Sequence, residues 1–260
     1  MTQPDSSEFV AIVPAGGTGA RVGGAIPKQY QPLAGQAMLV HTVRNLLRAN
    51  WIRRILIVVA ANEADRCAAL GLPTDRTTVL GLGGATRRDS VLAGLRALRH
   101  DAAATGDAGL NPWVMVHDAA RPGIPLAVLE RLKTAVSGGA DQAGAAVGAL
   151  AAVPVSDTVK EAAQQAQGDS GAQVARTISR ERLWLAQTPQ VFRLEPLVAA
   201  LEAFPGATDE AVAMEHAGHT PALVPGHWKN LKVTTPDDIE LAESILRNDL
   251  EPRIFHQEDR

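Results

Sequence analysis

Glycine, arginine and lysine follow the first apolar run of the chain in a pattern that could hold a polyphosphate. Apolar residues 9–13 are followed by a Gly-Gly-Thr-Gly turn at residues 16–19, then by Arg21, and after a proline by Lys28. Glycine lets the backbone approach a ligand closely and point successive N–H groups at it. Arg21 and Lys28 add positive charge to the same loop. This stretch favours binding of a nucleoside triphosphate, and with it phosphoryl or nucleotidyl transfer.

Two commoner nucleotide-binding motifs do not fit this loop. A P-loop has Ser or Thr directly after its lysine, whereas Lys28 is followed by Gln29. A dinucleotide fingerprint needs a third glycine where Val22 stands, and Pro27 would break a helix that started at the turn. An NAD-dependent oxidoreductase is therefore disfavoured. A strand-to-helix turn without a ligand stays open for this segment taken alone.

A second glycine-rich turn enters a helix that the apolar spacing predicts over residues 86–100. The turn contains Gly83 and Gly84, and Arg87 and Ser90 follow in the first turn of the helix. A helix N-terminus attracts anions, so these residues could contact the same ligand. The alternative is an ordinary helix start that Thr86 caps. Two such turns after two strands of one sheet favour the ligand.

One acidic residue, Asp118, follows His117 at the end of the strand predicted over residues 113–116. Ligands of open α/β sheets bind at the carboxyl ends of the strands. A single carboxylate there suits Mg²⁺, which takes one or two carboxylates and completes its shell with water and phosphate oxygens. A turn cap is the alternative interpretation of Asp118. We interpret His117 as a packing or orienting residue, because the sequence places no metal cluster or nucleophilic triad beside it.

Two later segments carry polar groups. The sequence pattern explains the first and leaves the role of the second undecided. The residues Thr208, Asp209 and Glu210 open a predicted helix, and capping explains them fully. Lys232 lies in an apolar run that we predict to be a strand at residues 231–233. Its ammonium group could point to water or to a phosphate at the ligand-binding edge, and both possibilities stay open.

The elements that must position these residues alternate between strands and helices. Apolar runs predict strands at residues 9–13, 55–60, 77–80, 113–116, 143–150 and 231–233. Helical spacing of apolar residues predicts helices at residues 38–47, 63–70, 86–100, 126–136, 208–217 and 236–246. This alternation predicts a doubly wound, mostly parallel α/β sheet with helices on both faces. Right-handed crossovers would bring both glycine turns and Asp118 to one edge of it.

The alternation breaks after Val153. Residues 154–160 and 174–178 read as two strands on either side of a Gln-, Ala- and Gly-rich tract, which predicts a projecting hairpin. A hairpin buries little by itself, so we expect it to pack on another subunit; a solvated surface hairpin fits the pattern equally well. We expect one domain over residues 8–248 that includes this arm at about 154–180, with polar tails at 1–7 and 249–260.

Composition narrows the class of protein. The 260 residues are 46% apolar and carry a net charge of −3, which disfavours nucleic acid as a partner. No apolar run reaches membrane-spanning length, and the first residues lack the layout of a signal peptide. The single cysteine, Cys67, excludes an internal disulfide framework and suits a reducing compartment. We therefore expect a cytoplasmic protein without a membrane partner.

Seven segments together resemble the 2-C-methyl-D-erythritol 4-phosphate cytidylyltransferases of the non-mevalonate isoprenoid pathway. They are VPAGGTGARVG with PKQY, GGATRRDSVLAGL, VHDAARP, PVSDTVK, QTPQVF, TDEA and NLKVTTPDD, in that order from residue 10 to about 245. The resemblance implies a Rossmann-like nucleotidyltransferase that converts CTP and 2-C-methyl-D-erythritol 4-phosphate to 4-diphosphocytidyl-2-C-methyl-D-erythritol and pyrophosphate. It also implies Mg²⁺ or another divalent cation, and a homodimer whose arms exchange contacts.

The resemblance further implies a role for each matching residue. Arg21 and Lys28 would be the catalytic cations, and Asp118 would face the metal. The CTP-binding residues would be Ala15, Gly16, Gly17, Thr18, Gly19, Gly84, Arg87 and Ser90. The polyol phosphate would contact Arg121, Thr158, Arg180, Thr208 and Lys232, with Thr158 and Arg180 reaching the neighbouring subunit's active site. The sequence departs from the family at Ala20 and Ala85, where many members carry a basic and an acidic residue.

The expected nucleophile is an oxygen of the substrate's own phosphate. A phosphate monoester has a second pKa of about 6 and is largely dianionic near neutral pH, so the reaction requires no protein base. A cytidylyltransferase for another polyol phosphate, such as ribitol 5-phosphate, is the nearest alternative, because the same CTP half would serve both. A non-catalytic nucleotide-sensing domain is the other alternative, and the presence of Arg21, Lys28 and Asp118 together disfavours it.

Overall fold

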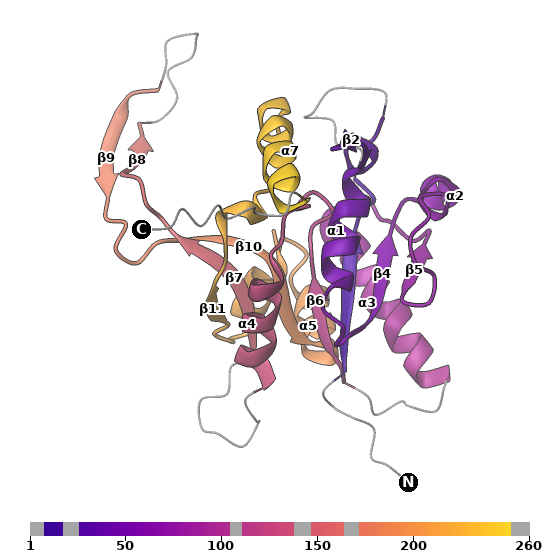
Figure 1. Cartoon of the computed structure of the whole chain (residues 1–260). Helices are drawn as coiled ribbons and strands as arrows, with labels where there is room; N and C mark the ends of the chain where they lie inside the picture. Colours follow the sequence, from indigo (N-terminus) through magenta and orange to yellow (C-terminus); the bar gives the residue numbers. More distant parts are fainter. Residues whose placement is uncertain (1–7, 18–25, 105–110, 138–146, 164–171, 251–260) are drawn as a thin grey trace, which may run out of the picture.

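A computed structural model shows that a seven-stranded mixed sheet forms the centre of the protein, in the order β11-β7-β10-β6-β1-β4-β5 (Figure 1). The structure describes residues 8–17, 26–104, 111–137, 147–163 and 172–250. Within the sheet β1 is parallel to β4 and β6, β4 to β5, and β7 to β11. Strand β10 runs antiparallel to both of its neighbours, β6 and β7. The predicted mostly parallel α/β sheet is thus confirmed.

The strands of this sheet are short to medium in length. They are β1 (Phe9–Pro14), β4 (Ile52–Val58), β5 (Thr77–Leu80), β6 (Trp113–Val116), β7 (Gly148–Pro154), β10 (Trp184–Arg193) and β11 (Ala222–Pro225). Two separate antiparallel pairs are β2 (Pro32–Leu33) with β3 (Gln36–Ala37), and β8 (Val159–Ala162) with β9 (Val174–Ile178).

Helices cover both faces of the sheet (Figure 1). They are α1 (Met38–Leu47), α2 (Ala64–Ala68), α3 (Arg87–Ala104), α4 (Leu126–Ser137), α5 (Leu194–Ala203), α6 (Glu210–His216) and α7 (Pro236–Leu250). Three short 3-10 helices are η1 (Lys28–Tyr30), η2 (Ala61–Glu63) and η3 (Trp228–Asn230). None of the helices within the described ranges is long and apolar enough to cross a membrane.

Alternate residues of β1 divide the core into two layers. Phe9, Ala11 and Val13 belong to the apolar cluster that contains side chains of α1 and α4. Val10 and Ile12 belong to the cluster that contains side chains of α3, α5 and α6. Since successive side chains of a strand point to opposite faces, β1 is buried on both sides. This explains why it reads as a continuous apolar run and not as an alternating one.

The structure corrects several predicted elements. The sequence reading missed β10, α5 and β11, and placed a strand at residues 231–233 where the structure has irregular backbone. In this segment the backbone N–H of Val233 donates to the carbonyl of Ala120, in the loop after β6. The segment therefore lies against that loop and is not a strand of the sheet. Strand β10 was missed because Pro189 interrupts it; the pairing with β7 is irregular between Ala186 and Gln190.

Strands β8 and β9 form the antiparallel pair that the alternating pattern predicts, with Val159 opposite Ile178. Most of their side chains are exposed, and Figure 1 shows the pair at the upper left, beyond the ends of β7 and β10. The second subunit expected against this pair stays a prediction. Helix α7 continues to Leu250, two residues past the predicted end of the domain at residue 248.

Candidate active site

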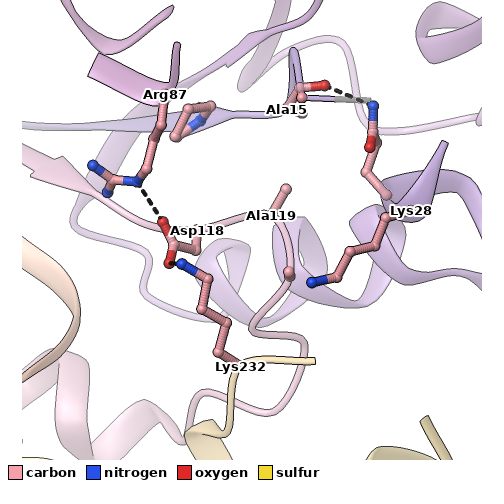
Figure 2. Close-up of a pocket in the computed structure, with 10 residues that line it drawn as sticks. Ala15, Lys28, Arg87, Asp118, Ala119 and Lys232 are labelled. Atoms are coloured by element: carbon pink, nitrogen blue, oxygen red, sulfur yellow. Dashed lines mark hydrogen bonds and ion pairs between the residues drawn. The ribbon is translucent and has the colours of Figure 1, made fainter. Parts of the chain in front are cut away.

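A pocket opens at the carboxyl ends of β1 and β6, where the parallel sheet is expected to bind a ligand (Figure 2). Its lining residues are Pro14, Ala15, Gly17, Lys28, Gln29, Arg87, Asp118, Ala119, Ala120 and Lys232. Six predicted site residues from five separate segments therefore meet in one place: Ala15, Gly17, Lys28, Arg87, Asp118 and Lys232.

The first glycine turn is held by backbone and side-chain contacts. Gln29 donates from Nε2 to the carbonyl of Ala15 at 2.7 Å, which ties η1 to the turn and fixes the start of the Lys28 side chain. A Cβ on Gly16 would lie 3.1 Å from Oγ of Ser90, so Gly16 lets the two glycine turns pack against each other. Thr18, Gly19 and Arg21 lie outside the described residues.

The polar groups of the second glycine turn form hydrogen bonds with one another. Oγ of Ser90 accepts from the backbone N–H of Gly84 and donates to the carbonyl of Thr86, both at 3.1 Å. Thr86 and Asp89 also bond each other's backbone N–H groups reciprocally, so the capping alternative is correct for Thr86. Ser90 is only 2% exposed and, like Gly84, does not line the pocket. Their predicted contact with CTP stays a prediction.

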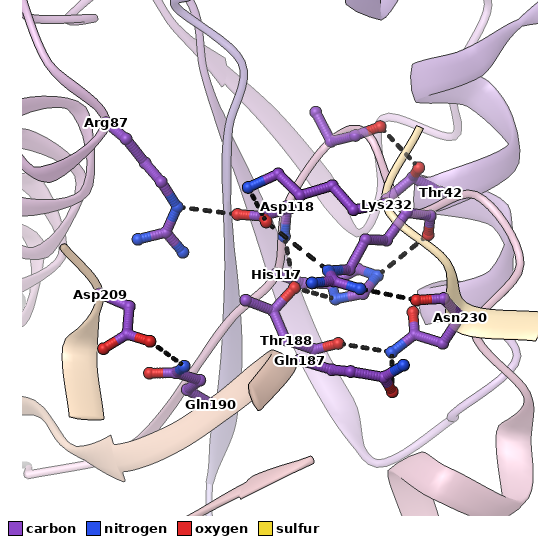
Figure 3. Close-up of polar contacts among 12 residues, drawn as sticks. Thr42, Arg87, His117, Asp118, Gln187, Thr188, Gln190, Asp209, Asn230 and Lys232 are labelled. Carbon is purple, nitrogen blue, oxygen red and sulfur yellow. Dashed lines mark hydrogen bonds and ion pairs between the residues drawn. The ribbon is translucent and has the colours of Figure 1, made fainter. Parts of the chain in front are cut away.

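Three cations surround the carboxylate of Asp118 at the end of β6. Nε of Arg87 donates to Oδ1 at 2.7 Å, Nζ of Lys232 lies 2.9 Å from Oδ2, and Nε of Arg121 lies 3.6 Å from the same oxygen (Figure 3). Burial favours the neutral acid, but these positive charges outweigh it and hold the pKa of Asp118 well below its ordinary value. Asp118 is therefore an anion at neutral pH.

Arg87 joins Asp118 to a second carboxylate, Glu210. The two Nη atoms of Arg87 bind the two oxygens of Glu210 at 2.7 and 3.0 Å. Burial opposes the charge of Arg87, but Glu210 and Asp118 together raise its pKa above the ordinary value. The sequence pattern explains Glu210 by helix capping and does not predict its pairing with Arg87. The only hint of this pairing in the sequence is that Glu210 is not needed for capping, because the neighbouring Asp209 can cap the helix alone.

A buried hydrogen-bonded chain fixes the backbone of Asp118. Its N–H donates to Oγ1 of Thr188, which also lies 3.0 Å from Nδ1 of His117. Nε2 of His117 lies 3.2 Å from the carbonyl of Arg121, and a carbonyl can only accept, so Nε2 carries the hydrogen. Burial lowers the pKa of His117 to about 4, so the imidazole is neutral at neutral pH. Its Nδ1 is unprotonated and accepts from the Thr188 hydroxyl. The predicted orienting role of His117 agrees with these contacts.

The same segment of β10 also holds the loop that carries Lys232. Nδ2 of Asn230 donates to Oε1 of Gln187 and to the carbonyl of Thr188, at 3.0 and 2.7 Å. Nη1 of Arg121 in turn donates to the carbonyl of Asn230 at 2.7 Å. Lys232 follows two residues later and lines the pocket. Of the two directions left open for its ammonium group, the structure shows the one toward the ligand-binding edge.

Three predicted substrate contacts lie apart from this pocket. Thr158, Arg180 and Thr208 are exposed, and none of them lines it. Thr158 and Arg180 flank the β8–β9 pair, where the resemblance places contacts with a neighbouring subunit. Arg121, a fourth predicted contact, does not line the pocket either; it is 9% exposed and reaches the pocket only through its contact with Oδ2 of Asp118.

The pocket has the donor set of a site for a cation shared with phosphates. Within the described ranges no three His, Cys, Asp or Glu side chains gather into a metal-binding cluster. Among the described lining residues Asp118 is the one carboxylate. A single carboxylate fits Mg²⁺ that takes its remaining ligands from water and a triphosphate.

Comparisons with known proteins agree on one family. The family model for 2-C-methyl-D-erythritol 4-phosphate cytidylyltransferase matches residues 9–248. Proteins of that name from Ralstonia nicotianae and Bordetella pertussis are each 46% identical to the chain, covering 94% and 93% of it and 94% and 100% of their own lengths. A crystal structure of a Francisella tularensis protein of the same name superimposes with a TM-score of 0.71 at 31% identity, over 92% of this chain and all of that one.

Proposed function

The chain belongs to the 2-C-methyl-D-erythritol 4-phosphate cytidylyltransferase family, and from this premise we propose how its pocket carries out the reaction. The protein is a nucleotidyltransferase that moves the cytidylyl group of CTP to 2-C-methyl-D-erythritol 4-phosphate in the non-mevalonate pathway. The observation that carries the proposed site is the meeting of the first glycine turn, Lys28, Asp118 and Lys232 in one pocket.

The reaction exchanges one phosphorus–oxygen bond for another. An oxygen of the substrate phosphate attacks the α-phosphorus of CTP, and the bond from that phosphorus to the oxygen bridging to the β-phosphate breaks. Pyrophosphate leaves with the bonding electrons, and no proton is transferred to the protein. We therefore assign the protein's contribution to alignment for in-line attack and to stabilisation of negative charge.

Lysines on two sides of the pocket supply this charge stabilisation. Figure 2 shows the ammonium group of Lys28 on one side of the pocket and that of Lys232 beside the carboxylate of Asp118. Lys28 follows the glycine turn, so we assign it to the triphosphate of CTP, with Arg21 as the second catalytic cation. We assign Lys232, with Arg121, to the phosphate of the polyol substrate. The turn residues Ala15 to Gly19 and the second turn with Gly84, Arg87 and Ser90 are the proposed CTP contacts.

Asp118 would hold the divalent ion. Its two oxygens contact Arg87 at Oδ1 and Lys232 at Oδ2, and its carboxylate would supply the protein ligand of the ion. When bound, Mg²⁺ would neutralise charge on the α-phosphate and on the leaving pyrophosphate.

A homodimer would complete the site. Thr158, Arg180 and Thr208 are exposed in one protomer, and the β8–β9 pair buries little of its own surface. We propose that residues 154–180 pack on a second copy and bring Thr158 and Arg180 to its pocket, with residues 8–248 forming one catalytic domain. A cytoplasmic location is also proposed, because a single cysteine suits a reducing compartment.

Pyrophosphate release tests the assignment directly. The protein should release pyrophosphate with CTP, Mg²⁺ and 2-C-methyl-D-erythritol 4-phosphate, and release much less with ribitol 5-phosphate. Pyrophosphate release with ribitol 5-phosphate alone would show that the protein acts on another polyol phosphate. Binding of CTP without release in either mixture would instead support a nucleotide-sensing domain.

A further inference from the structure

Glu210 is a charged side chain of the interior that the reaction described above does not use. It begins α6, and the residue is 0% exposed. A buried carboxylate is strongly unfavourable unless it is paired and hydrogen-bonded. Its partner is Arg87, which binds both carboxylate oxygens with two parallel N–H···O bonds. Such a bidentate pair fixes the geometry of both side chains.

The start of α6 is held in place without the help of Arg87. Asp209 caps the helix by accepting from the N–H of Val212 at 2.9 Å. Gln190 of β10 donates to Oδ2 of Asp209 at 3.0 Å and accepts from the N–H of Ala211 at 2.8 Å. Capping therefore does not require Glu210. These contacts make Glu210 a fixed anchor on which Arg87 is placed.

Arg87 connects this anchor to the pocket. The N–H groups of a guanidinium lie in one plane in fixed directions, so holding both Nη atoms on Glu210 sets the direction of Nε–H. That N–H donates to Oδ1 of Asp118 at 2.7 Å. Figure 3 shows Arg87 reaching Asp118 from one side and Lys232 reaching it from the other. Glu210 thus acts on Asp118 through a single intervening side chain.

We propose that Glu210 is a positioning residue for cytidylyl transfer, which fixes Oδ1 of Asp118 through Arg87 and limits that arginine to one oxygen of the carboxylate. Asp118 faces the positive charges of Arg87, Arg121 and Lys232. Glu210 adds a second negative charge that offsets Arg87. Without it, Arg87 would be drawn toward both oxygens of Asp118 and would compete with a divalent ion there. This inference rests on the proposed metal role of Asp118.

The test compares two Glu→Gln variants. Glu210→Gln should weaken binding of Mn²⁺ in the presence of CTP, measured by the electron paramagnetic resonance signal of free Mn²⁺ without polyol phosphate. Loss of a group that orients a metal ligand typically costs about 10- to 100-fold in affinity or activity, and we expect kcat to fall by a similar factor. The matched control is Glu202→Gln on α5, which breaks an exposed ion pair with Arg96. Equal Mn²⁺ affinity in the two variants would overturn the proposal.

A double-mutant cycle asks whether Glu210 acts through Arg87. In the Arg87→Gln background, Glu210→Gln should cause no further loss of Mn²⁺ affinity, because the connection is already broken. An equal loss in both backgrounds would contradict the proposal. Should Glu210→Gln fail to fold, Glu210→Asp takes its place in the cycle: it keeps the charge, but its shorter side chain cannot bind both Nη atoms in the same geometry.

The outcome also separates this proposal from the proposed function. If the unmodified protein released no pyrophosphate, the assigned reaction would be refuted. The Mn²⁺ measurement is made without turnover, so it would still decide whether Glu210 controls the ion site. Normal turnover of the unmodified protein together with unchanged Mn²⁺ binding by Glu210→Gln would refute the role of Glu210 alone.

Discussion

The hydroxyl of Thr188, in β10, lies 3.0 Å from the backbone nitrogen of Asp118, at the end of β6. Because the same hydroxyl contacts His117, the antiparallel strand of the sheet fixes the loop that carries the pocket's carboxylate. Three neighbouring β10 residues divide this work. Gln187 holds Asn230, Thr188 holds Asp118, and Gln190 holds the start of α6.

Removing the Thr188 hydroxyl should disturb both folding and catalysis. In Thr188→Val the N–H of Asp118 and Nδ1 of His117 lose their shared partner, at a cost of about 1–3 kcal/mol in the free energy of unfolding. Activity should fall by about 10- to 100-fold as the Asp118 loop shifts. Urea unfolding and kcat/KM measure the two effects. Thr188→Ser keeps the hydroxyl and is the control; a valine variant as active as the serine variant would contradict the assignment.

Lys28→Ala should abolish most turnover and leave the fold intact. Removing one charge that stabilises the transition state typically costs about 3–4 kcal/mol, so turnover should slow by roughly two to three orders of magnitude. The rate of pyrophosphate release at saturating substrate measures this loss, and circular dichroism checks the fold. A turnover rate close to that of the unmodified protein would show that Lys28 is not a catalytic cation.

Substitution of Lys232 should affect one substrate more than the other. If Lys232 binds the phosphate of the polyol substrate, Lys232→Ala raises the KM for that substrate by about 10-fold or more, the loss of one charge-assisted hydrogen bond. The KM for CTP should change much less. Steady-state kinetics with each substrate varied in turn distinguishes the two. A selective rise in the KM for CTP would reassign Lys232 to the triphosphate.

Gly83→Ala should destabilise the protein through the second glycine turn. A Cβ on Gly83 would lie 2.7 Å from the carbonyl carbon of Val59, too close to backbone that cannot move aside. We expect a loss of about 1–3 kcal/mol, the usual range for overpacking, and a lower Tm. Gly17→Ala is the stability control, because nothing lies within 4 Å of its added Cβ. Equal Tm values for the two variants would show that the turn adapts.

Asp238 should make the stability of α7 depend on pH. Burial favours its neutral form, but bonds from Thr234 and Thr235 outweigh this and lower its pKa to about 2, below the ordinary value of about 3.9. Its contribution is therefore complete above about pH 5, well above the unfolded pKa, and is lost as the pH falls toward 2. At neutral pH Asp238→Ala should cost about 1 kcal/mol, as for a lost helix cap. The stability difference between the unmodified protein and Asp238→Ala should shrink between pH 5 and pH 2.

Local patterns were sufficient for the elements that carry long apolar runs or clear helical spacing. Helix α1 and strands β5 and β6 begin and end where the sequence predicts. Strand β10 could not be found this way, because Pro189 is normally a sign against a central strand. Its place in the sheet depends on pairing with β6 and β7, which are distant in sequence.

The site shows the same division. The glycine turns, Lys28 and Asp118 can be recognised in the sequence from their residue types and from their positions after predicted strands. Glu210 does not, since an acidic residue in a first helical turn has a sufficient local explanation. Only the folded arrangement, which brings the start of α6 to the start of α3, reveals that its carboxylate meets Arg87. For Lys232 the sequence pattern left two directions open, and the contact of its Nζ with Oδ2 of Asp118 decides between them.

The pairing of Arg87 with Glu210 spans 123 positions of the chain, and that of Arg121 with Asn230 spans 109. A ribosome makes the glycine turns, Lys28 and Asp118 first. It makes Thr188, Glu210 and Asn230, which hold Asp118 and its two arginine partners in place, only later. An unfinished chain would carry the nucleotide-facing loops without their supports. Completion of the pocket is therefore a late event in biosynthesis, and shortened chains that end before Asn230 should be inactive even if their sheet forms.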